Sequence, residues 1–210
     1  MANERSVVLN AAVEGSVDEA ILRRLVSHVG GGLGATYGKR GKQHLRVRLA
    51  GYNSAAEHAP WIALVDLDDD YDCAPPLRQE WLPNPARWMC FRVAVREVEA
   101  WLIADHEGIA KYLSLSRAIV PRTSEDLVDP KRTMVDLARR SRRRDIREGM
   151  VPSAGSGRGV GPTYSSSLIE FALEHWSPQR AQDRADSLRR CIERLGHLVE
   201  DVHAAWAHEL

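Results

Sequence analysis

Acidic side chains follow three apolar runs of the chain, and each run has the length and composition of a buried strand. Ligands of parallel α/β sheets collect beyond the carboxyl ends of the strands, so acids that are distant in sequence can meet there. Clustered carboxylates repel one another unless a cation neutralises them, and their hard oxygens suit Mg²⁺ or Mn²⁺ better than zinc. The pattern therefore predicts a divalent metal site. The acids concerned are Glu14, Asp18, Asp66, Asp68, Glu97 and Glu99.

The spacing of Asp66 and Asp68 bears on this site. Residues two apart in a strand point to the same face, so both carboxylates can reach one ion if the strand persists through Asp68. The alternative is a solvated acidic turn, because the segment 66–72 holds five aspartates in seven residues. Spacing alone leaves both interpretations open.

The two acids after the third run pose a choice. In a helix Glu97 shares a face with Trp101, whereas Glu99 lies about 200° from Glu97, so only one of the two acids can face the metal. We favour Glu97, because it lies nearer the end of the strand. In the alternative, Arg96 and Glu97 form an ion pair at the entry to the helix and Trp101 belongs to the core.

The elements that would position these acids alternate between strand and helix. Such alternation indicates an α/β fold with a mostly parallel sheet covered on both faces. Expected strands are 7–13, 61–68 and 88–95, and expected helices are 16–29, 43–56, 77–81 and one that begins near 96. The glycine run 30–34 follows a helix and lacks the lysine of a phosphate loop, which predicts a flexible connection.

Strand-like runs disappear after residue 113. We therefore divide the chain into an α/β domain, 1–113, and a helical extension packed on it, 114–210. Within the extension Asp129 and Pro130 are a typical helix start, with the aspartate as cap and the proline at the first helical position. Further helices are expected at 163–175 and from Gln179 to about His208, with a Ser/Gly-rich loop at 152–161.

The extension is also locally basic. Between Lys131 and Glu148 there are eight cations and three acids. Arginine suits phosphate, so this patch and a short basic stretch upstream predict sequence-independent binding of DNA or RNA. The alternatives are a solvated helix face that pairs with the acids or with a partner chain, and ordinary loop charges upstream. The candidate nucleic-acid contacts are Lys39, Arg40, Lys42, Arg142, Arg143 and Arg144.

The composition limits the classes of protein to which the chain can belong. The 210 residues carry 29 basic and 29 acidic side chains, so the formal charge of zero excludes a uniformly basic coat protein. The three cysteines are far apart in the sequence and form no C-x-x-C motif, so they indicate neither a zinc ribbon nor a disulfide framework. Such cysteines are typical of a reducing cytosol. No signal peptide and no membrane-length apolar run is found, which predicts a cytoplasmic protein with no membrane partner. The oligomeric state is left open.

Two of the acidic motifs resemble the TOPRIM domain of topoisomerases, primases and OLD-family (overcoming lysogenization defect) nucleases. The first is Glu14-Gly15, at the end of a strand that leads into a helix, and the second is Asp66-Leu67-Asp68, at the end of a later strand. Asp18 stands where the nuclease branch tends to carry a second acid. The resemblance implies a TOPRIM-like sheet.

The order of the motifs also looks like the uncharacterised prokaryotic family catalogued as domain of unknown function 4276. This likeness covers about residues 6–113 well and the C-terminal half loosely. Two further segments carry it, Tyr37-Gly38-Lys39-Arg40-Gly41-Lys42 and Arg96-Glu97-Val98-Glu99-Ala100-Trp101-Leu102-Ile103-Ala104-Asp105.

The TOPRIM resemblance implies Mg²⁺ held by Asp66 and Asp68, with Glu14 as a further ligand or as the general acid/base in phosphodiester chemistry. Asp18 and Glu97 or Glu99 would complete a second metal position. Two ions about 4 Å apart can activate water and stabilise the leaving oxygen. No tyrosine is placed as a topoisomerase nucleophile, and no Walker A motif is present, so any ATPase would be a separate chain.

The expected function is thus that of a Mg²⁺-dependent nuclease. Likeness to neighbours of its class implies a place in antiphage defence beside an ATPase partner. One alternative is a TOPRIM-shaped subunit that docks on the ATPase without cutting anything, and another is an enzyme that acts on a small phosphate compound.

Overall fold

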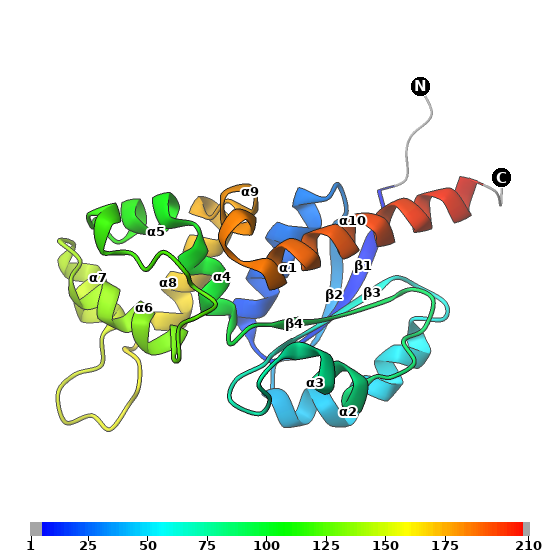
Figure 1. Cartoon of the computed structure of the whole chain (residues 1–210), viewed down its shortest axis with the longest axis horizontal. Coiled ribbons are helices and arrows are strands. Elements are labelled where there is room, and N and C mark those ends of the chain that lie inside the picture. The colour runs from blue at the N-terminus through cyan, green and yellow to red at the C-terminus, as the bar shows by residue number, and fades with distance from the viewer. Residues whose placement is uncertain (1–5, 208–210) are drawn as a thin grey trace.

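Four parallel strands form the centre of the fold, in the order β2-β1-β3-β4 (Figure 1). The structure is a computed structural model and describes residues 6–207. The predicted α/β class and its mostly parallel sheet are therefore confirmed. The strands are β1 (Val8–Val13), β2 (Gly32–Gly38), β3 (Trp61–Asp66) and β4 (Met89–Ala94).

The glycine-rich segment after the first helix forms the edge strand β2, so the prediction of a flexible connection there was wrong. Main-chain pairing with β1 overrides the low strand propensity of glycine, beginning with the Gly32 amide, which donates to the Val7 carbonyl at 2.8 Å. The strand ends at Gly38, which has a φ of +91°. A Cβ at this position would lie 2.2 Å from the Val13 carbonyl oxygen, so only glycine fits there.

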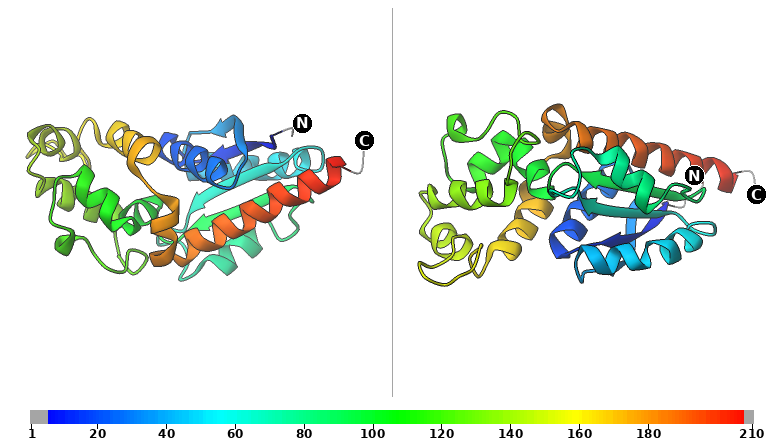
Figure 2. Two further views of the ribbon diagram at one scale, coloured as in Figure 1. Left: turned by 90° about the horizontal axis from the view of Figure 1, so that it is seen from above. Right: turned by 60° about the horizontal axis from the view of Figure 1, so that its bottom comes forward.

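Helices cover both faces of the sheet (Figure 2). Alternate residues of β1 enter two separate cores, Leu9, Ala11 and Val13 on one face and Ala12 on the other. α1 and α10 pack on the first face, and α2 and α3 pack on the second. These helices are α1 (Ser16–His28), α2 (Lys42–Ala55), α3 (Ala74–Trp81) and α10 (Asp186–Ala207).

The other helices form a lobe that the carboxyl ends of the strands face (Figure 1). The helix predicted from its Asp129-Pro130 start is α6, and the one predicted at 163–175 is α8 continued by a π-helical turn. They are α4 (Val98–Ala104), α5 (His106–Tyr112), α6 (Pro130–Arg139), α7 (Arg144–Met150), α8 (Tyr164–Glu170), the π-helical turn Phe171–His175, α9 (Pro178–Ala181) and the 3₁₀ turns Arg117–Ile119 and Gln182–Arg184.

The long helix expected from Gln179 is divided. α9 and a 3₁₀ turn come first, the backbone is extended at Ala185, and α10 then runs along the sheet to Ala207. His208, the predicted end of this helix, lies outside the described residues.

One core crosses residue 113, where the predicted domain boundary falls. Trp101 of α4 is fully buried, and its indole N–H donates to Ser187 Oγ on α10 at 2.7 Å. Trp176 is also fully buried and donates its indole N–H to the Trp101 carbonyl at 3.2 Å. The helical lobe is therefore fixed to the sheet through α4.

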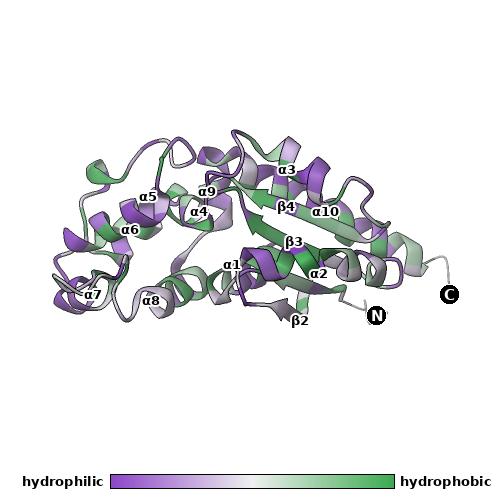
Figure 3. Ribbon diagram, turned by 90° about the horizontal axis from the view of Figure 1, so that it is seen from below, coloured by the Kyte–Doolittle hydropathy of each residue, from purple (hydrophilic) through white to green (hydrophobic). Residues whose placement is uncertain are grey.

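Hydropathy follows the layers: β3 and β4 are among the most hydrophobic elements, whereas the helices mix hydrophobic and hydrophilic residues along their lengths (Figure 3). Among residues 6–207, no helix combines the length and the apolar character needed to cross a lipid bilayer.

Candidate metal centre

The centre of the acidic site is a contact between two neighbouring strands. Glu14 directly follows β1 and Asp66 is the last residue of β3. In the sheet, β1 is followed by its neighbour β2 on one side, and β3 is followed by its neighbour β4 on the other side. The carboxyl ends of β1 and β3 therefore form the topological switch point, where such sheets bind ligands. Glu14 Oε1 accepts a hydrogen bond from the Asp66 backbone amide at 2.9 Å. The structure thus brings these two predicted residues together.

Asp18 joins them from the first turn of α1. Its Oδ2 accepts a hydrogen bond from the Gly15 amide at 2.6 Å, so the carboxylate folds back over the start of the helix. Asp18 is buried, with 6% of its surface exposed. The capping geometry that starts α1 therefore also holds this carboxylate beside Glu14, whose charge acts on it.

Glu99, from the first turn of α4, is the fourth acid of the group. It is 4% exposed, and its charge acts on both Asp18 and Asp66. Its Oε1 accepts a hydrogen bond from the Tyr164 hydroxyl at 3.1 Å and lies 3.8 Å from Lys131 Nζ. We call Glu14, Asp18, Asp66 and Glu99 the acidic cluster.

Glu97 is held differently. Its two carboxylate oxygens accept hydrogen bonds from the backbone amide and the ammonium of Lys131, both at 2.8 Å. We favoured Glu97 because it lies nearer the end of the strand, and we compared the two acids as residues of one helix. Glu97 is instead the N-cap of α4, with an extended backbone. The helical-face argument therefore did not apply to it, and the structure puts Glu99 in the cluster and Glu97 against α6.

Burial raises the pKa of every carboxyl in the acidic cluster, and the charges of neighbouring acids add to this effect. Burial raises the pKa of Asp18 to about 7, against the Gly15 hydrogen bond and with the help of the Glu14 and Glu99 charges. The pKa of Asp66 rises well above its usual value, through burial and then the charges of Asp18, Glu99 and Glu14. Burial also raises the pKa values of Glu14 and Glu99. A proton or a cation would relieve this repulsion.

Asp68 does not continue the strand. β3 ends at Asp66, and Asp68 has a φ of +51° and donates its amide to the Arg96 carbonyl at 2.8 Å. The expectation that the strand persists through Asp68 was therefore wrong. Its carboxylate binds Lys42 Nζ at 2.8 Å, and the same ammonium binds Asp70 at 2.7 Å. Its charge still acts on Asp66.

The predicted nucleic-acid contacts lie in two separate places. Near the sheet, Lys42 is bound by the acidic turn, Lys39 binds Glu19 at 2.5 Å, and Arg40 is exposed. The other three lie around the start of α7, at the end of the lobe away from the sheet (Figure 1). They are Arg142, which is exposed, Arg143, which binds Asp145 at 2.5 Å, and Arg144, which binds Glu148 at 2.7 Å.

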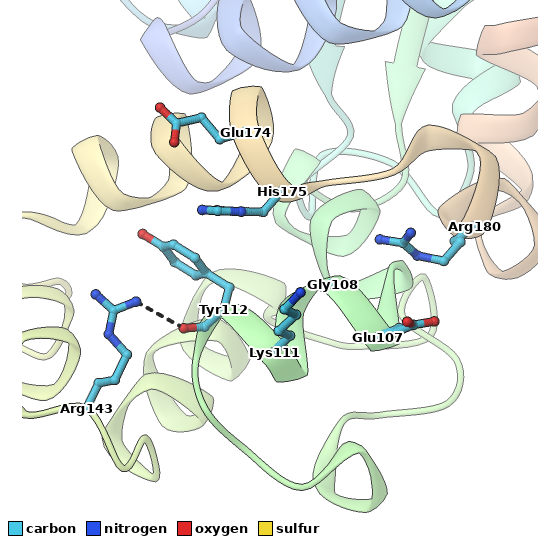
Figure 4. Close-up of a pocket in the computed structure, with 8 residues that line it drawn as sticks. All are labelled: Glu107, Gly108, Lys111, Tyr112, Arg143, Glu174, His175 and Arg180. Carbon is cyan, nitrogen blue, oxygen red and sulfur yellow. Dashed lines mark hydrogen bonds between the residues drawn. The ribbon is translucent and has the colours of Figure 1, made fainter.

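Arg143 lines a hollow of about 390 Å³ inside the lobe (Figure 4). Its guanidinium donates to the Tyr112 carbonyl at 3.4 Å, and the ring of Tyr112 lies 5.4 Å from that of His175. No member of the acidic cluster lines this hollow. The hollow at Arg143 is therefore lined by other residues than the candidate metal centre.

The oxygens of the acidic cluster suit a hard divalent cation, but they do not form a closed cage. Among the described residues, the only three side chains whose ligand atoms all lie within 4.8 Å of one another are Glu170, Glu174 and His175, which are exposed on the π-helical turn and its approach. Mg²⁺ commonly uses one or two carboxylates and keeps several waters. The donor chemistry of the cluster fits such an ion.

Sequence reasoning missed two side chains of this site, Lys131 and Tyr164. The cap at Asp129 placed Lys131 in the first turn of a helix, but nothing local showed that this turn contacts Glu97. Tyr164 had no signal at all, because it lies 65 residues from Glu99. Comparison of the chain with protein-family models, with curated proteins and with solved structures gave no match.

Proposed function

We propose that this chain is a Mg²⁺- or Mn²⁺-dependent nuclease that hydrolyses phosphodiester bonds. The observation that carries the proposal is the contact between Glu14 and Asp66 at the switch point of the sheet, with Asp18 and Glu99 beside them. Acids at the ends of β1 and β3 also support the TOPRIM resemblance. An ATPase partner and a role in antiphage defence remain part of this proposal.

Asp66 and Glu14 are the residues that would hold the ion, and the charges of Asp18 and Glu99 act on Asp66 from nearby. When bound, the ion would supply Lewis-acid stabilisation and a water of lowered pKa. The Asp66 amide orients the Glu14 carboxylate, and the Val98 amide orients that of Asp66 at 2.9 Å. The raised pKa of Glu14 suits it to accept a proton from an attacking water.

Cleavage of plasmid DNA and of RNA by the purified chain, with MgCl₂, MnCl₂ or EDTA, tests this function. Glu14→Gln and Asp66→Asn should each lower metal-dependent cleavage by about 100-fold or more. Glu193→Gln, on the exposed side of α10, is the matched control and should cut like the wild type. Wild-type cleavage by both site variants overturns the proposal.

Two lysines favour the second candidate, a subunit that docks on an ATPase without cutting. Lys42 and Lys131 already bind Asp68, Asp70 and Glu97 at 2.7 to 2.8 Å, so part of the acidic charge is neutralised within the chain. In that case calorimetric titration with MnCl₂ should give no heat, the chain should cut nothing, and it should bind the ATPase in a pull-down. Heat of binding that Asp66→Asn removes excludes this candidate.

A further inference from the structure

Two hollows of the surface meet at Lys131 and Asp129. The first, of about 330 Å³, is also lined by Asp68, Asp69 and Glu97, and the ammonium of its Lys131 lies 3.8 Å from Glu99 of the acidic cluster. The second, of about 340 Å³, lies between α6 and the loop that joins α7 to α8. Because Lys131 and Asp129 line both, the two hollows are neighbours on the surface. We call the second hollow the α6 groove.

The α6 groove carries an excess of positive charge. Its cations are Lys131, Arg132, Arg139 and Arg158, and its acids are Asp129 and Asp136. Both acids are engaged: Asp129 caps α6 by accepting from the Arg132 amide at 2.7 Å, and Asp136 binds the Arg139 guanidinium.

Two of these guanidinium groups are available to a ligand. Among the described residues, no acid lies within ion-pair distance of Arg132 or Arg158, and both side chains are exposed. A planar guanidinium with five donors suits a phosphate oxygen pair. The groove therefore offers two uncommitted phosphate ligands, one from each of its walls.

Register along α6 sets the length of the groove. Lys131, Val135 and Arg139 repeat every four residues and so form one stripe of the helix. The stripe is about 12 Å long at 1.5 Å per residue. This length matches three or four nucleotides of a stacked strand, at about 3.4 Å each.

The opposite wall is a loop with a fixed base and an open tip. At the base, the Gly161 amide donates to the Met150 carbonyl and the Thr163 amide donates to the Gly149 carbonyl, both at 2.9 Å. At the tip, an added Cβ on Gly155, Gly157 or Gly159 would meet no atom within 4 Å. Arg158 thus lies on an open segment and lines the groove together with residues of α6.

We propose that the α6 groove binds the phosphate backbone of a nucleic-acid strand, with Arg132 and Arg158 on phosphates next to the one cleaved. This inference rests on the proposed function, because the groove shares Lys131 with the neighbouring hollow, and Lys131 lies 3.8 Å from Glu99 of the acidic cluster. It also replaces Arg142, Arg143 and Arg144 as the contacts, since two of those three are bound to acids at the far end of the lobe. Binding through phosphates takes DNA and RNA alike.

Fluorescence anisotropy of labelled 12-nucleotide single strands tests the groove. DNA and RNA of one sequence are titrated with the full chain in EDTA, so that binding is measured without cleavage, at several salt concentrations. The test variant is Arg132→Gln/Arg158→Gln. The matched control is Arg48→Gln/Arg190→Gln, which removes two exposed arginines on α2 and α10.

The test variant should lose at least tenfold in affinity, and its slope of log affinity against log salt should fall by about 1.4, for two phosphate contacts. The control should lose less than twofold. The proposal is contradicted if the test variant keeps the affinity and slope of the wild type, or if the wild type does not bind the strands. Arg132→Lys/Arg158→Lys, which keeps the charge, should keep the slope, and circular dichroism checks that each variant is folded.

This experiment fails separately from the proposed function. If the chain binds strands through Arg132 and Arg158 but cuts nothing with Mg²⁺ or Mn²⁺, the groove stands and the nuclease is excluded. If the chain cuts but the test variant binds strands like the wild type, nuclease activity is supported and strand binding in the α6 groove is excluded.

Discussion

The Glu14 carboxylate accepts a hydrogen bond from the backbone amide of Asp66, 2.9 Å away on the neighbouring strand. This contact links the ends of β1 and β3, so Glu14 has a structural role besides any chemical one. The two roles can be separated, because glutamine keeps the accepting oxygen and alanine does not.

We predict that Glu14→Gln is at least as stable as the wild type, because burial raises the pKa of this carboxyl, whereas Glu14→Ala loses about 1–3 kcal/mol because the Asp66 amide is left without this acceptor. Both variants should lose metal-dependent cleavage. Urea unfolding at pH 7 measures the difference in stability. Equal stability of the glutamine and alanine variants contradicts the structural role.

Asp18 predicts how stability depends on pH. Its pKa is raised from 3.8 to about 7 in the folded chain, so the folded state holds this proton more tightly than the unfolded state. The stabilisation is complete below about pH 4 and is lost as the pH rises through 7. Asp18→Asn keeps an oxygen for the Gly15 amide without the charge. It should therefore be more stable than the wild type at pH 8, by on the order of 2 kcal/mol.

Thermal unfolding at pH 5 and pH 8 checks this prediction. The midpoint of Asp18→Asn should exceed that of the wild type by several degrees at pH 8, and the difference should shrink at pH 5. Asp201→Asn, on the exposed side of α10, serves as the control and should show no such pH dependence. A wild type that is the more stable protein at pH 8 contradicts the prediction.

Glu99 and Glu97 should differ in their effect on metal binding. Glu99 belongs to the acidic cluster, so Glu99→Gln should weaken Mn²⁺ binding by about 10- to 100-fold. Glu97 is bound to Lys131, so Glu97→Gln should change Mn²⁺ affinity by less than about threefold. Isothermal titration calorimetry measures both. The reverse order of effects would restore Glu97 as the ligand.

The ion pair between Asp105, the N-cap of α5, and the half-exposed Arg180 of α9 should be a main support of the helical lobe. Asp105 is fully buried, and its carboxylate accepts from Arg180 at 2.7 Å and from the Gly108 and Ser177 amides at 3.0 and 2.9 Å. Asp105→Ala leaves the two backbone amides without their acceptor, whereas the half-exposed Arg180 can turn to water, so the cost should be about 2–4 kcal/mol.

Urea unfolding followed by circular dichroism gives this value. Asp145→Ala, which removes an exposed acid paired with Arg143, is the control and should leave the unfolding midpoint nearly unchanged. A small effect of Asp105→Ala would show that the lobe does not depend on this pair.

The base of the α7–α8 loop should tolerate no side chain at Gly161. A Cβ there would lie 2.3 Å from the Gly149 carbonyl oxygen, so Gly161→Ala should destabilise the chain by about 1–3 kcal/mol. Gly159 has open space around it, and Gly159→Ala should be neutral or slightly stabilising. Equal urea unfolding midpoints of Gly161→Ala and Gly159→Ala would contradict the prediction that the loop base at Gly161 has no room for a side chain.

The alternation of strand and helix could be predicted from the sequence. β1, β3 and β4 are buried on both faces, so their apolar runs are visible without any knowledge of their neighbours. β2 could not be predicted, because its glycine-rich sequence has no strand signal and only pairing with β1 makes it a strand. The turn at Asp68 was hidden for a similar reason, since its amide is held by Arg96, 28 residues away.

The candidate site could also be predicted only in part. The residue types and strand-end positions of Glu14 and Asp66 were enough to expect them together, because carboxyl ends of parallel strands meet at one edge. The choice of Glu99 over Glu97 depended on where α4 begins, and the contacts of Lys131 and Tyr164 depended on the packing of the lobe.

The sequence by itself thus determined which acids stand at the ends of the strands, because hydrophobic periodicity is a local property of the chain. The tertiary structure decided which charges face one another, down to the placement of Arg132 and Arg158 on two walls of one groove. That placement depends on contacts between segments far apart in the chain, and no local pattern encodes them.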